Sequence, residues 1–150
     1  MAKEVARLKP EVVFMSDTNG TARRVTGTGA ATDQVSAGLT TALTAFRSAG
    51  AKLIFLEVPP RSGNLQQCVT AVSSPQDCMT KVNAKWSDYT TTQRATVKAD
   101  GGTYVDVLQY FCYQDYCPAV IGSTPVYMDG EHLTQKFSIS MAPLLASIVP

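Results

Sequence analysis

The segment AKLIFLEVPP (residues 51–60) decides the fold class, because it is a short apolar run that a pair of prolines ends. Such a run is too short for a buried helix and is typical of an interior strand of a parallel sheet, whose faces are both covered. Two other segments have strand character: EVVFMS (residues 11–16) earlier in the chain and the alternating TYVDVL (residues 103–108) later. Together, these three segments predict a parallel sheet.

The segments that separate and follow the strands have the periodicity of helices. One helix is expected from Asp33 to Gly50, a second over residues 79–99, and a third over residues 132–150, where Pro143 should kink it or start a new turn. The alternation of strands and helices predicts an α/β fold of three layers, with a parallel sheet between helices. The apolar residues that share a helical face are Val35, Leu39, Leu43 and Phe46, then Val82, Trp86, Tyr89 and Val97, then Phe137, Met141, Leu144, Leu145 and Ile148.

The remaining segments are expected to be loops. Residues 17–33 are rich in Gly, Thr and Asp, and residues 61–78 and 112–125 each hold a pair of cysteines. Only VYM (residues 126–128) is expected to add a brief strand.

Composition bounds the class of protein. With 150 residues, 45% of them hydrophobic and 17% charged, the chain has the size and make-up of one globular domain. The net charge is +1 and the two signs are scattered, which argues against nucleic acid as a partner. No apolar run approaches the roughly 20 residues that span a bilayer, and the start lacks the continuous apolar core of a secretory signal.

The four cysteines form two local pairs, Cys68 with Cys78 and Cys112 with Cys117. Sequence allows three connectivities, of which pairing neighbours closes the shortest loops. A structural zinc site is the main alternative, but C-x9-C is a poor zinc knuckle, so no metal or other cofactor is expected. Disulfides would place the chain in an oxidising compartment. Since the chain shows no export signal, we expect it to be a piece of a longer, exported protein.

The segment YMDGEHLT (residues 127–134) contains the only histidine, His132, three residues after Asp129. A neutral imidazole can take a proton from a hydroxyl and return it to a leaving group, while a carboxylate on its other ring nitrogen orients it. The spacing would let both side chains face one cleft at the start of a helix. On spacing alone, a histidine near an aspartate is more often a surface or core pair than a catalytic one.

The surroundings of this motif resemble a known family. CPAVIGSTPVYMDGEHLTQKFSISMAPLL (residues 117–145) resembles the end of the SGNH-hydrolase-like domains that are fused to bacterial acyltransferase-3 membrane proteins. The matching elements are the cysteine before Pro118, VY before D-x-x-H-L-T, and APLL (residues 142–145). Further back, KPEVVFMS, AKLIFLEVPP, C-x9-C and YVDVLQYFC follow the family's order, so the resemblance covers nearly the whole chain.

The resemblance implies a flavodoxin-like domain outside the cytoplasmic membrane, tethered through its parent protein. Such a domain assists O-acylation, usually O-acetylation, of a cell-wall or surface glycan, so its partners are an acyl donor, a glycan acceptor and the membrane acyltransferase domain. By the family's pattern His132 is the base and Asp129 its orienting acid. The nucleophilic serine belongs to a G-D-S block on the first strand, and neither G-D-S nor G-x-S-x-G occurs in this sequence.

We therefore expect these residues to form the C-terminal portion of a single SGNH-like domain, inactive by itself. A missing first strand would expose a sheet edge, which favours a homodimer. The same pair could instead serve a free-standing SGNH esterase or deacetylase, and a non-catalytic glycan-binding domain could keep the same fold.

Three further residues are weaker candidates for the predicted rim of the sheet. Ser16 ends the strand predicted for residues 11–16. Asn19, in SDTNG, could donate to an oxyanion, as a side-chain amide can. Arg61 follows the second strand and could meet an acidic glycan or an acyl carbonyl. The simpler interpretations are a hydroxyl at the start of a loop for Ser16, a turn residue for Asn19 and an exposed arginine without a role for Arg61.

Overall fold

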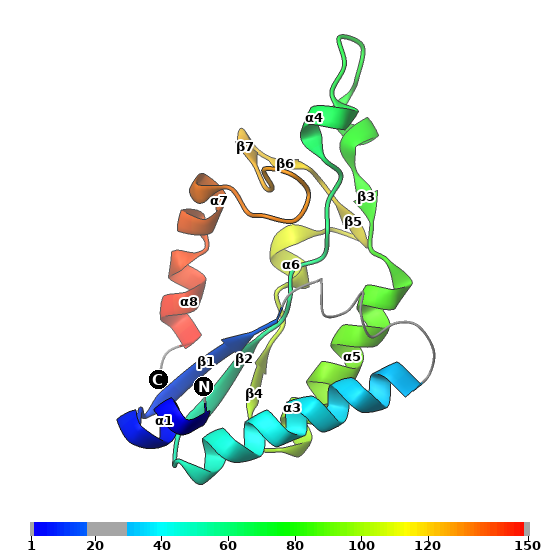
Figure 1. Cartoon of the computed structure of the whole chain (residues 1–150). Coiled ribbons are helices and arrows are strands. Elements are labelled where there is room, and N and C mark those ends of the chain that lie inside the picture. The colour runs from blue at the N-terminus through cyan, green and yellow to red at the C-terminus, as the bar shows by residue number, and fades with distance from the viewer. Residues whose placement is uncertain (1, 18–29, 149–150) are drawn as a thin grey trace. The chain divides into compact units, whose positions relative to one another are not determined.

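The three segments with strand character form the three strands of a parallel sheet (Figure 1). The strands are β1 (Val12–Ser16), β2 (Lys52–Leu56) and β4 (Thr103–Val105), in the order β1-β2-β4. Both pairings are parallel, with Phe14 opposite Ile54 and Ile54 opposite Thr103. The predicted parallel sheet is confirmed.

The structure is a computed structural model that describes residues 2–17 and 30–148. Its chain divides into two compact units. Unit 1 consists of residues 1–59 and 83–108 and contains the parallel sheet; unit 2 consists of residues 60–82 and 109–150.

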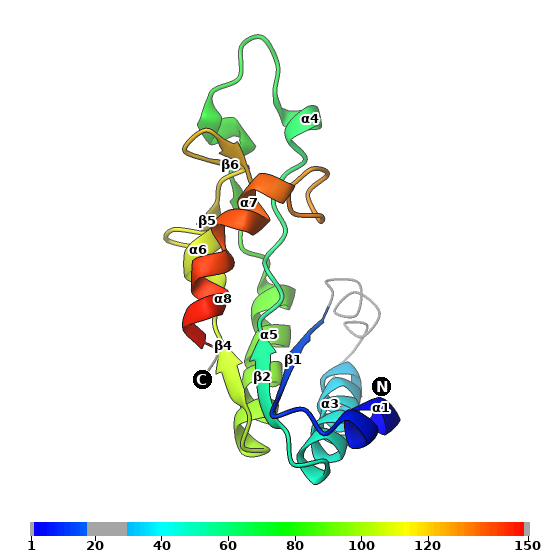
Figure 2. The same ribbon diagram turned by 90° about the vertical axis from the view of Figure 1, so that its left-hand side faces the viewer.

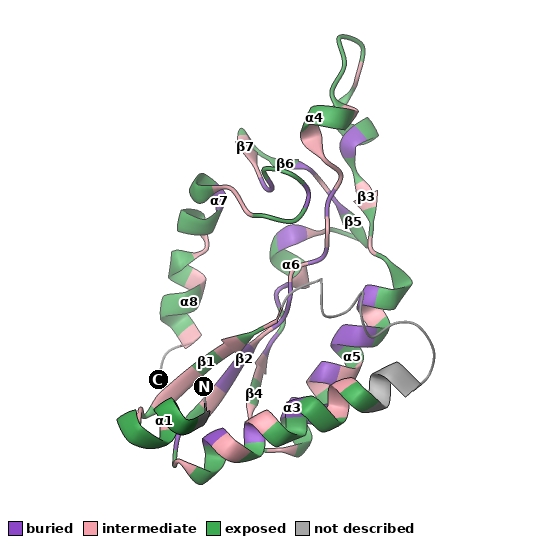
Figure 3. Cartoon of the chain, in the orientation of Figure 1, coloured by how far each residue is buried: buried purple, intermediate pink, exposed green. Residues whose placement is uncertain are grey.

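In unit 1, two long helices cover one face of the sheet (Figure 2). They are α3 (Ala30–Ser48) and α5 (Ala84–Ala99), and the short helix α1 (Ala2–Leu8) packs beside α3. A hydrogen bond of 3.1 Å joins Ser36 of α3 to Thr96 of α5. The buried residues gather where these helices meet β2 (Figure 3): Leu39, Leu43, Phe55 and Val97.

The sequence placed the starts of both helices incorrectly. The first begins at Ala30, before the expected Asp33. The second begins at Ala84 rather than at Met79, because the side chain of Asn83 accepts the backbone N–H of Lys85 at 2.8 Å and caps the helix there. The prediction that Trp86 and Tyr89 belong to the core is confirmed, since both are buried.

Unit 2 is built from short elements, several of which lie in segments that were predicted to be loops. Two pairs of antiparallel strands form, β3 with β5 and β6 with β7. The short elements of unit 2 before residue 126 are α4 (Leu65–Cys68), the 3-10 helix η1 (Pro75–Cys78), β3 (Thr80–Lys81), α6 (Leu108–Phe111), which begins at the last residue of unit 1, β5 (Tyr116–Cys117), β6 (Val120–Ile121) and β7 (Thr124–Pro125). Each is only a few residues long, too short for a periodic sequence pattern.

Disulfides join the neighbouring cysteines, as expected. The S–S distances are 2.00 Å for Cys68–Cys78 and 2.02 Å for Cys112–Cys117. The first closes the loop between α4 and η1, and the second fixes the turn before β5.

The C-terminal segment forms two helices, α7 (Gln135–Ser140) and α8 (Ala142–Ile148). The break falls at Met141, so the prediction that Pro143 starts a new turn is confirmed. Residues 126–128 do not form the expected strand; Tyr127 makes only an isolated bridge to Leu133. None of the helices in residues 2–17 and 30–148 is long and apolar enough to cross a membrane.

Candidate active site

Asp129 and His132 lie in the turn between β7 and α7, where their side chains meet. Oδ2 of Asp129 is 2.6 Å from Nδ1 of His132. Oδ1 of Asp129 accepts the backbone N–H groups of Glu131 at 3.0 Å and of His132 at 2.8 Å. The expected proximity of the carboxylate and the imidazole is therefore present. We call these two residues the dyad.

Each member of the dyad shifts the pKa of the other. The backbone N–H of His132, its ring and the N–H of Glu131 donate to Asp129 and hold the pKa of that carboxyl at about 2, below its usual range. The hydrogen bond to Asp129 and the charge of that carboxylate raise the pKa of His132. A carboxylate on Nδ1 keeps the proton of a neutral ring on that nitrogen, which leaves the lone pair of Nε2 to accept a proton. The His132 side chain is 72% exposed, so Nε2 can meet a reactant.

Anchored residues flank the dyad turn on both sides. Tyr127 is buried, its hydroxyl donates to the carbonyl of Pro60, and its ring packs on Phe111. After the turn, Thr134 caps α7 by accepting the N–H of Phe137, and its hydroxyl donates to the carbonyl of Pro125 at 2.6 Å. The dyad is thus presented on a short exposed turn with fixed ends.

Gly130 lets this turn approach the segment that follows β2. Its φ is +87°, a conformation that favours glycine. A Cβ at this position would come within 2.8 Å of the carbonyl oxygen of Ser62. Ser62 itself is 9% exposed, and this burial does not suit a nucleophile that must meet a substrate.

Arg61 lies beside the dyad turn in unit 2. Its guanidinium pairs with the carboxylate of Glu131 at 2.6 Å. Arg61 is thus not the exposed arginine of the simpler interpretation, since its side chain is only 26% exposed and ion-paired. Glu131 was missed in the sequence, although it stands inside the D-x-x-H motif.

Ser16, another predicted rim residue, does not belong to the same unit as the dyad. Ser16 ends β1 in unit 1, where it is exposed and borders a pocket of about 430 Å³ together with Asp17 and Gln93. Asn19 lies outside the described residues. The carboxylate of Asp17 accepts the hydroxyl proton of Tyr89 in a hydrogen bond, which ties the end of β1 to α5.

A buried carboxylate in unit 1, Glu57, was also missed by the sequence analysis. It is 1% exposed and accepts the N–H groups of Val107 at 3.0 Å and Leu108 at 3.2 Å. The hydroxyl of Tyr104 and the guanidinium of Arg94 also donate to it, at 3.0 and 3.2 Å. Burial raises the pKa of Glu57 despite these donors. Glu57 therefore links the end of β2 to the end of β4, and we assign it a structural role.

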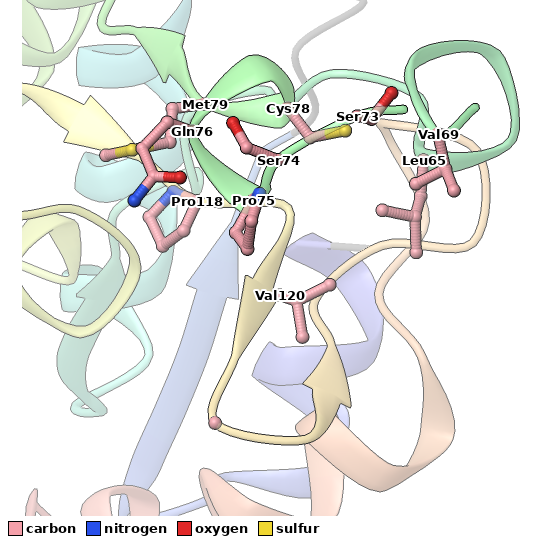
Figure 4. A pocket seen from close by; sticks show the side chains of 11 residues that line it. Leu65, Val69, Ser73, Ser74, Pro75, Gln76, Cys78, Met79, Pro118 and Val120 are labelled. Carbon is pink, nitrogen blue, oxygen red and sulfur yellow. The ribbon is translucent and has the colours of Figure 1, made fainter. Parts of the chain in front are cut away.

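A second pocket lies in unit 2 around the first disulfide (Figure 4). Its volume is about 350 Å³, and no ionisable side chain borders it. The lining is formed by α4, η1 and β6 and includes Leu65, Val69, Met79 and Val120. Neither member of the dyad is among its lining residues.

Comparison with known proteins identifies the family. Residues 2–147 match the family model described as "SGNH domain (fused to AT3 domains)".

The chain belongs to this SGNH family.

A solved structure supports the fold of this SGNH domain. The match is to the periplasmic domain of the lipopolysaccharide acetyltransferase of Salmonella ser. Paratyphi A, with a TM-score of 0.69 and 18% sequence identity. It covers 97% of this chain and 60% of that one, so the SGNH chain described here spans about three-fifths of its structural neighbour. No curated protein matches the sequence. The predicted SGNH-type α/β fold is confirmed.

Proposed function

We propose that this SGNH chain is a portion of a single extracytoplasmic domain that assists the transfer of an acyl group, chiefly acetyl, to a hydroxyl of a cell-wall or surface glycan. His132 acts as the general base and Asp129 orients it. The observation that carries the proposal is the 2.6 Å contact between Nδ1 of His132 and Oδ2 of Asp129. Support comes from the family's fusion to AT3 domains and from the acetyltransferase that shares the fold. The family match spans both units, which supports treating them as one domain.

The proposed reaction proceeds in two steps through an acyl-serine. Nε2 of His132 takes the proton of a serine hydroxyl, and the serine oxygen attacks the acyl carbonyl of the donor. The imidazolium returns the proton to the leaving group, and an acyl-serine remains. His132 then takes the proton of the sugar hydroxyl, which attacks the acyl-serine; the proton passes to the serine oxygen as the glycan ester forms. Asp129 stabilises the imidazolium in both steps.

The serine must come from a G-D-S block, which this sequence does not contain. We place that block on a strand that pairs with the outer edge of β1, since β1 ends the order β1-β2-β4 and no described strand covers its other edge. The alternative occupant of this edge is a second copy of the chain. Asn19, three residues after the end of β1 in the sequence, would donate to the oxyanion.

The test is His132→Ala in the full-length parent protein, with formation of the acylated glycan as the readout. Loss of transfer with an unchanged unfolding temperature is expected, because the base is removed from an exposed turn. Lys136→Ala, an exposed residue of α7, is the matched control and should transfer normally. Normal transfer by the His132→Ala protein would refute the assigned base and favour a non-catalytic domain.

The same measurement separates transfer from hydrolysis. A transferase places the acyl group on the glycan, whereas an esterase releases the free acid when water replaces the sugar. Release of acid without any glycan ester would identify the chain as part of an esterase.

A further inference from the structure

The dyad turn rests on the segment of residues 60–64 through three separate contacts within unit 2. The hydroxyl of Tyr127 donates to the carbonyl of Pro60. Gly130 packs against the carbonyl of Ser62, where there is no room for a side chain. The third contact is the ion pair of Arg61 with Glu131. Two of the three contacts involve backbone atoms of residues 60–64, and the ion pair is the one made between two side chains.

The ion pair is short and partly sheltered. Nη2 of Arg61 is 2.6 Å from Oε1 of Glu131, and the two side chains are 26% and 46% exposed. A charge-assisted hydrogen bond of a planar guanidinium to a carboxylate is directional, so it restricts where the carboxylate can lie. The exposure of Glu131 keeps the energetic contribution of such a pair modest. Its main effect is therefore on the geometry of the turn.

Glu131 is linked to both members of the dyad. Its backbone N–H donates to Oδ1 of Asp129 at 3.0 Å, the same oxygen that accepts the N–H of His132. A shift of Glu131 would move the donor that holds Asp129, and with it the carboxylate that orients the imidazole. Fixing the side chain of Glu131 to Arg61 thus fixes the carboxylate and the ring together.

We propose that Arg61 is a positioning residue that holds the dyad turn in its reactive geometry through Glu131. The inference rests on the proposed function, in which the turn supplies the base. Arg61 acts here at the turn and not on the substrate, which distinguishes this role from contact with an acidic glycan. Because a small misplacement of a catalytic group lowers the rate steeply, the ion pair matters for turnover more than for folding.

The experiment is a charge-reversal cycle in the full-length parent: Arg61→Glu, Glu131→Arg and the double variant. Each single variant should lose about 10- to 100-fold in kcat with KM nearly unchanged. The double variant restores the pair in reverse and should recover most of that loss. Arg47→Glu is the matched control, because Arg47 makes its ion pair with Asp100 in unit 1, outside the dyad turn, and should leave kcat unchanged.

A second readout does not depend on activity. His132 is the only histidine, so the ring-nitrogen NMR signals of the untagged chain report on this site alone. Arg61→Glu should shift or broaden the Nδ1 proton signal, and the double variant should restore it. If Arg61→Glu prevents folding, Glu131→Gln, which removes the charge and keeps the size, takes its place.

The outcomes separate the two proposals. An inactive His132→Ala protein beside an Arg61→Glu protein with normal kcat and an unchanged Nδ1 signal would overturn the positioning role and leave the proposed function intact. An active His132→Ala protein would overturn the proposed function, and the NMR signal would still decide whether Arg61 orders the turn. A kcat that falls in Arg61→Glu but does not recover in the double variant would also contradict the positioning role.

Discussion

Asp129 bonds to His132 twice, through a different carboxylate oxygen each time. Oδ2 lies 2.6 Å from the ring nitrogen Nδ1, and Oδ1 accepts the backbone N–H of the same residue at 2.8 Å. One side chain therefore both builds the turn and orients the ring. An amide in its place can keep the backbone bonds through its oxygen but can no longer act as an anion toward the ring. Replacing Asp129 by asparagine thus separates the two tasks.

The first prediction concerns Asp129→Asn in the full-length parent. Acyl transfer should fall by about 10⁴-fold, as when the orienting carboxylate of a serine-protease triad becomes an amide. The fold should persist, because the amide oxygen can still accept the backbone N–H groups. Transfer is measured as glycan ester formed per unit time. Asp88→Asn, an exposed position on α5, is the control; a loss in that control equal to the loss in Asp129→Asn would contradict a specific role.

The second prediction concerns the pKa of His132 in the isolated chain. Asp129 raises this pKa, so it should lie above the usual value of about 6.5, and Asp129→Asn should lower it. Because the folded state holds the proton more tightly than the unfolded state, the linked stabilisation is complete below the unfolded pKa. It is lost as the pH rises through the folded pKa. NMR titration of the single histidine measures its pKa. A pKa that does not fall in Asp129→Asn would contradict the contact between Asp129 and the His132 ring.

The parts of the structure that sequence predicted are those governed by local or periodic patterns. Two of the strands were predicted from short apolar runs, and the third from the alternating pattern of TYVDVL. The dyad was predicted because Asp129 stands three residues before His132, the only histidine, in a motif that resembles the family's, so the contact lies within one local segment.

Contacts between residues that are far apart in the sequence could not be predicted from a local pattern. Arg61 and Glu131 are far apart in the sequence, and so are Glu57 and Arg94. No periodicity links such residues, and only the fold brings them together. The short strands and helical turns of unit 2 were missed because two to four residues are too few to show a period.

The third prediction concerns the buried carboxylate of Glu57. Arg94→Met removes its cationic donor and should lower the free energy of unfolding by about 1.5–3 kcal/mol at neutral pH. Burial already raises the pKa of Glu57, and losing a neighbouring cation should raise it further. A carboxyl whose folded pKa is raised contributes stability below its unfolded pKa and loses it as the pH rises through the folded pKa. The cost of Arg94→Met should therefore be larger at neutral than at acidic pH.

Urea unfolding at the two pH values measures this difference. Arg47→Met instead removes an ion pair whose guanidinium is 60% exposed, and it should cost less than Arg94→Met. An equal cost of Arg94→Met at both pH values would show that its loss does not act through the charge of Glu57.

The fourth prediction concerns the disulfides. Protein made in an oxidising compartment should offer no cysteine to an alkylating reagent until it is reduced, and then should offer four. Replacing Cys68 and Cys78 by serine should cost about 2–3 kcal/mol, and replacing Cys112 and Cys117 slightly less, because the second bridge closes a shorter loop. Mass spectrometry counts the labelled thiols, and four labelled thiols before reduction would exclude both bridges.

The fifth prediction concerns Gly130, whose φ of +87° is costly for any other residue. Gly122 offers a matched control in the same unit, because its φ is +60° and a Cβ there would meet nothing within 4 Å. Gly122→Ala should therefore cost only the conformational penalty, about 1 kcal/mol. Gly130→Ala pays that penalty and also meets the carbonyl oxygen of Ser62 at 2.8 Å, and this oxygen belongs to the backbone and cannot rotate away.

Gly130→Ala should thus be less stable than Gly122→Ala in urea unfolding. Gly130→Ala should also shift the backbone of the dyad turn, whereas Gly122→Ala should leave that backbone unchanged. The shift would appear in the amide NMR signals of Glu131 and His132, whose N–H groups both donate to Asp129. If both variants lose the same stability and leave those two signals in place, the turn does not depend on its contact with Ser62. The dyad would then be held by Asp129 and its flanking anchors alone.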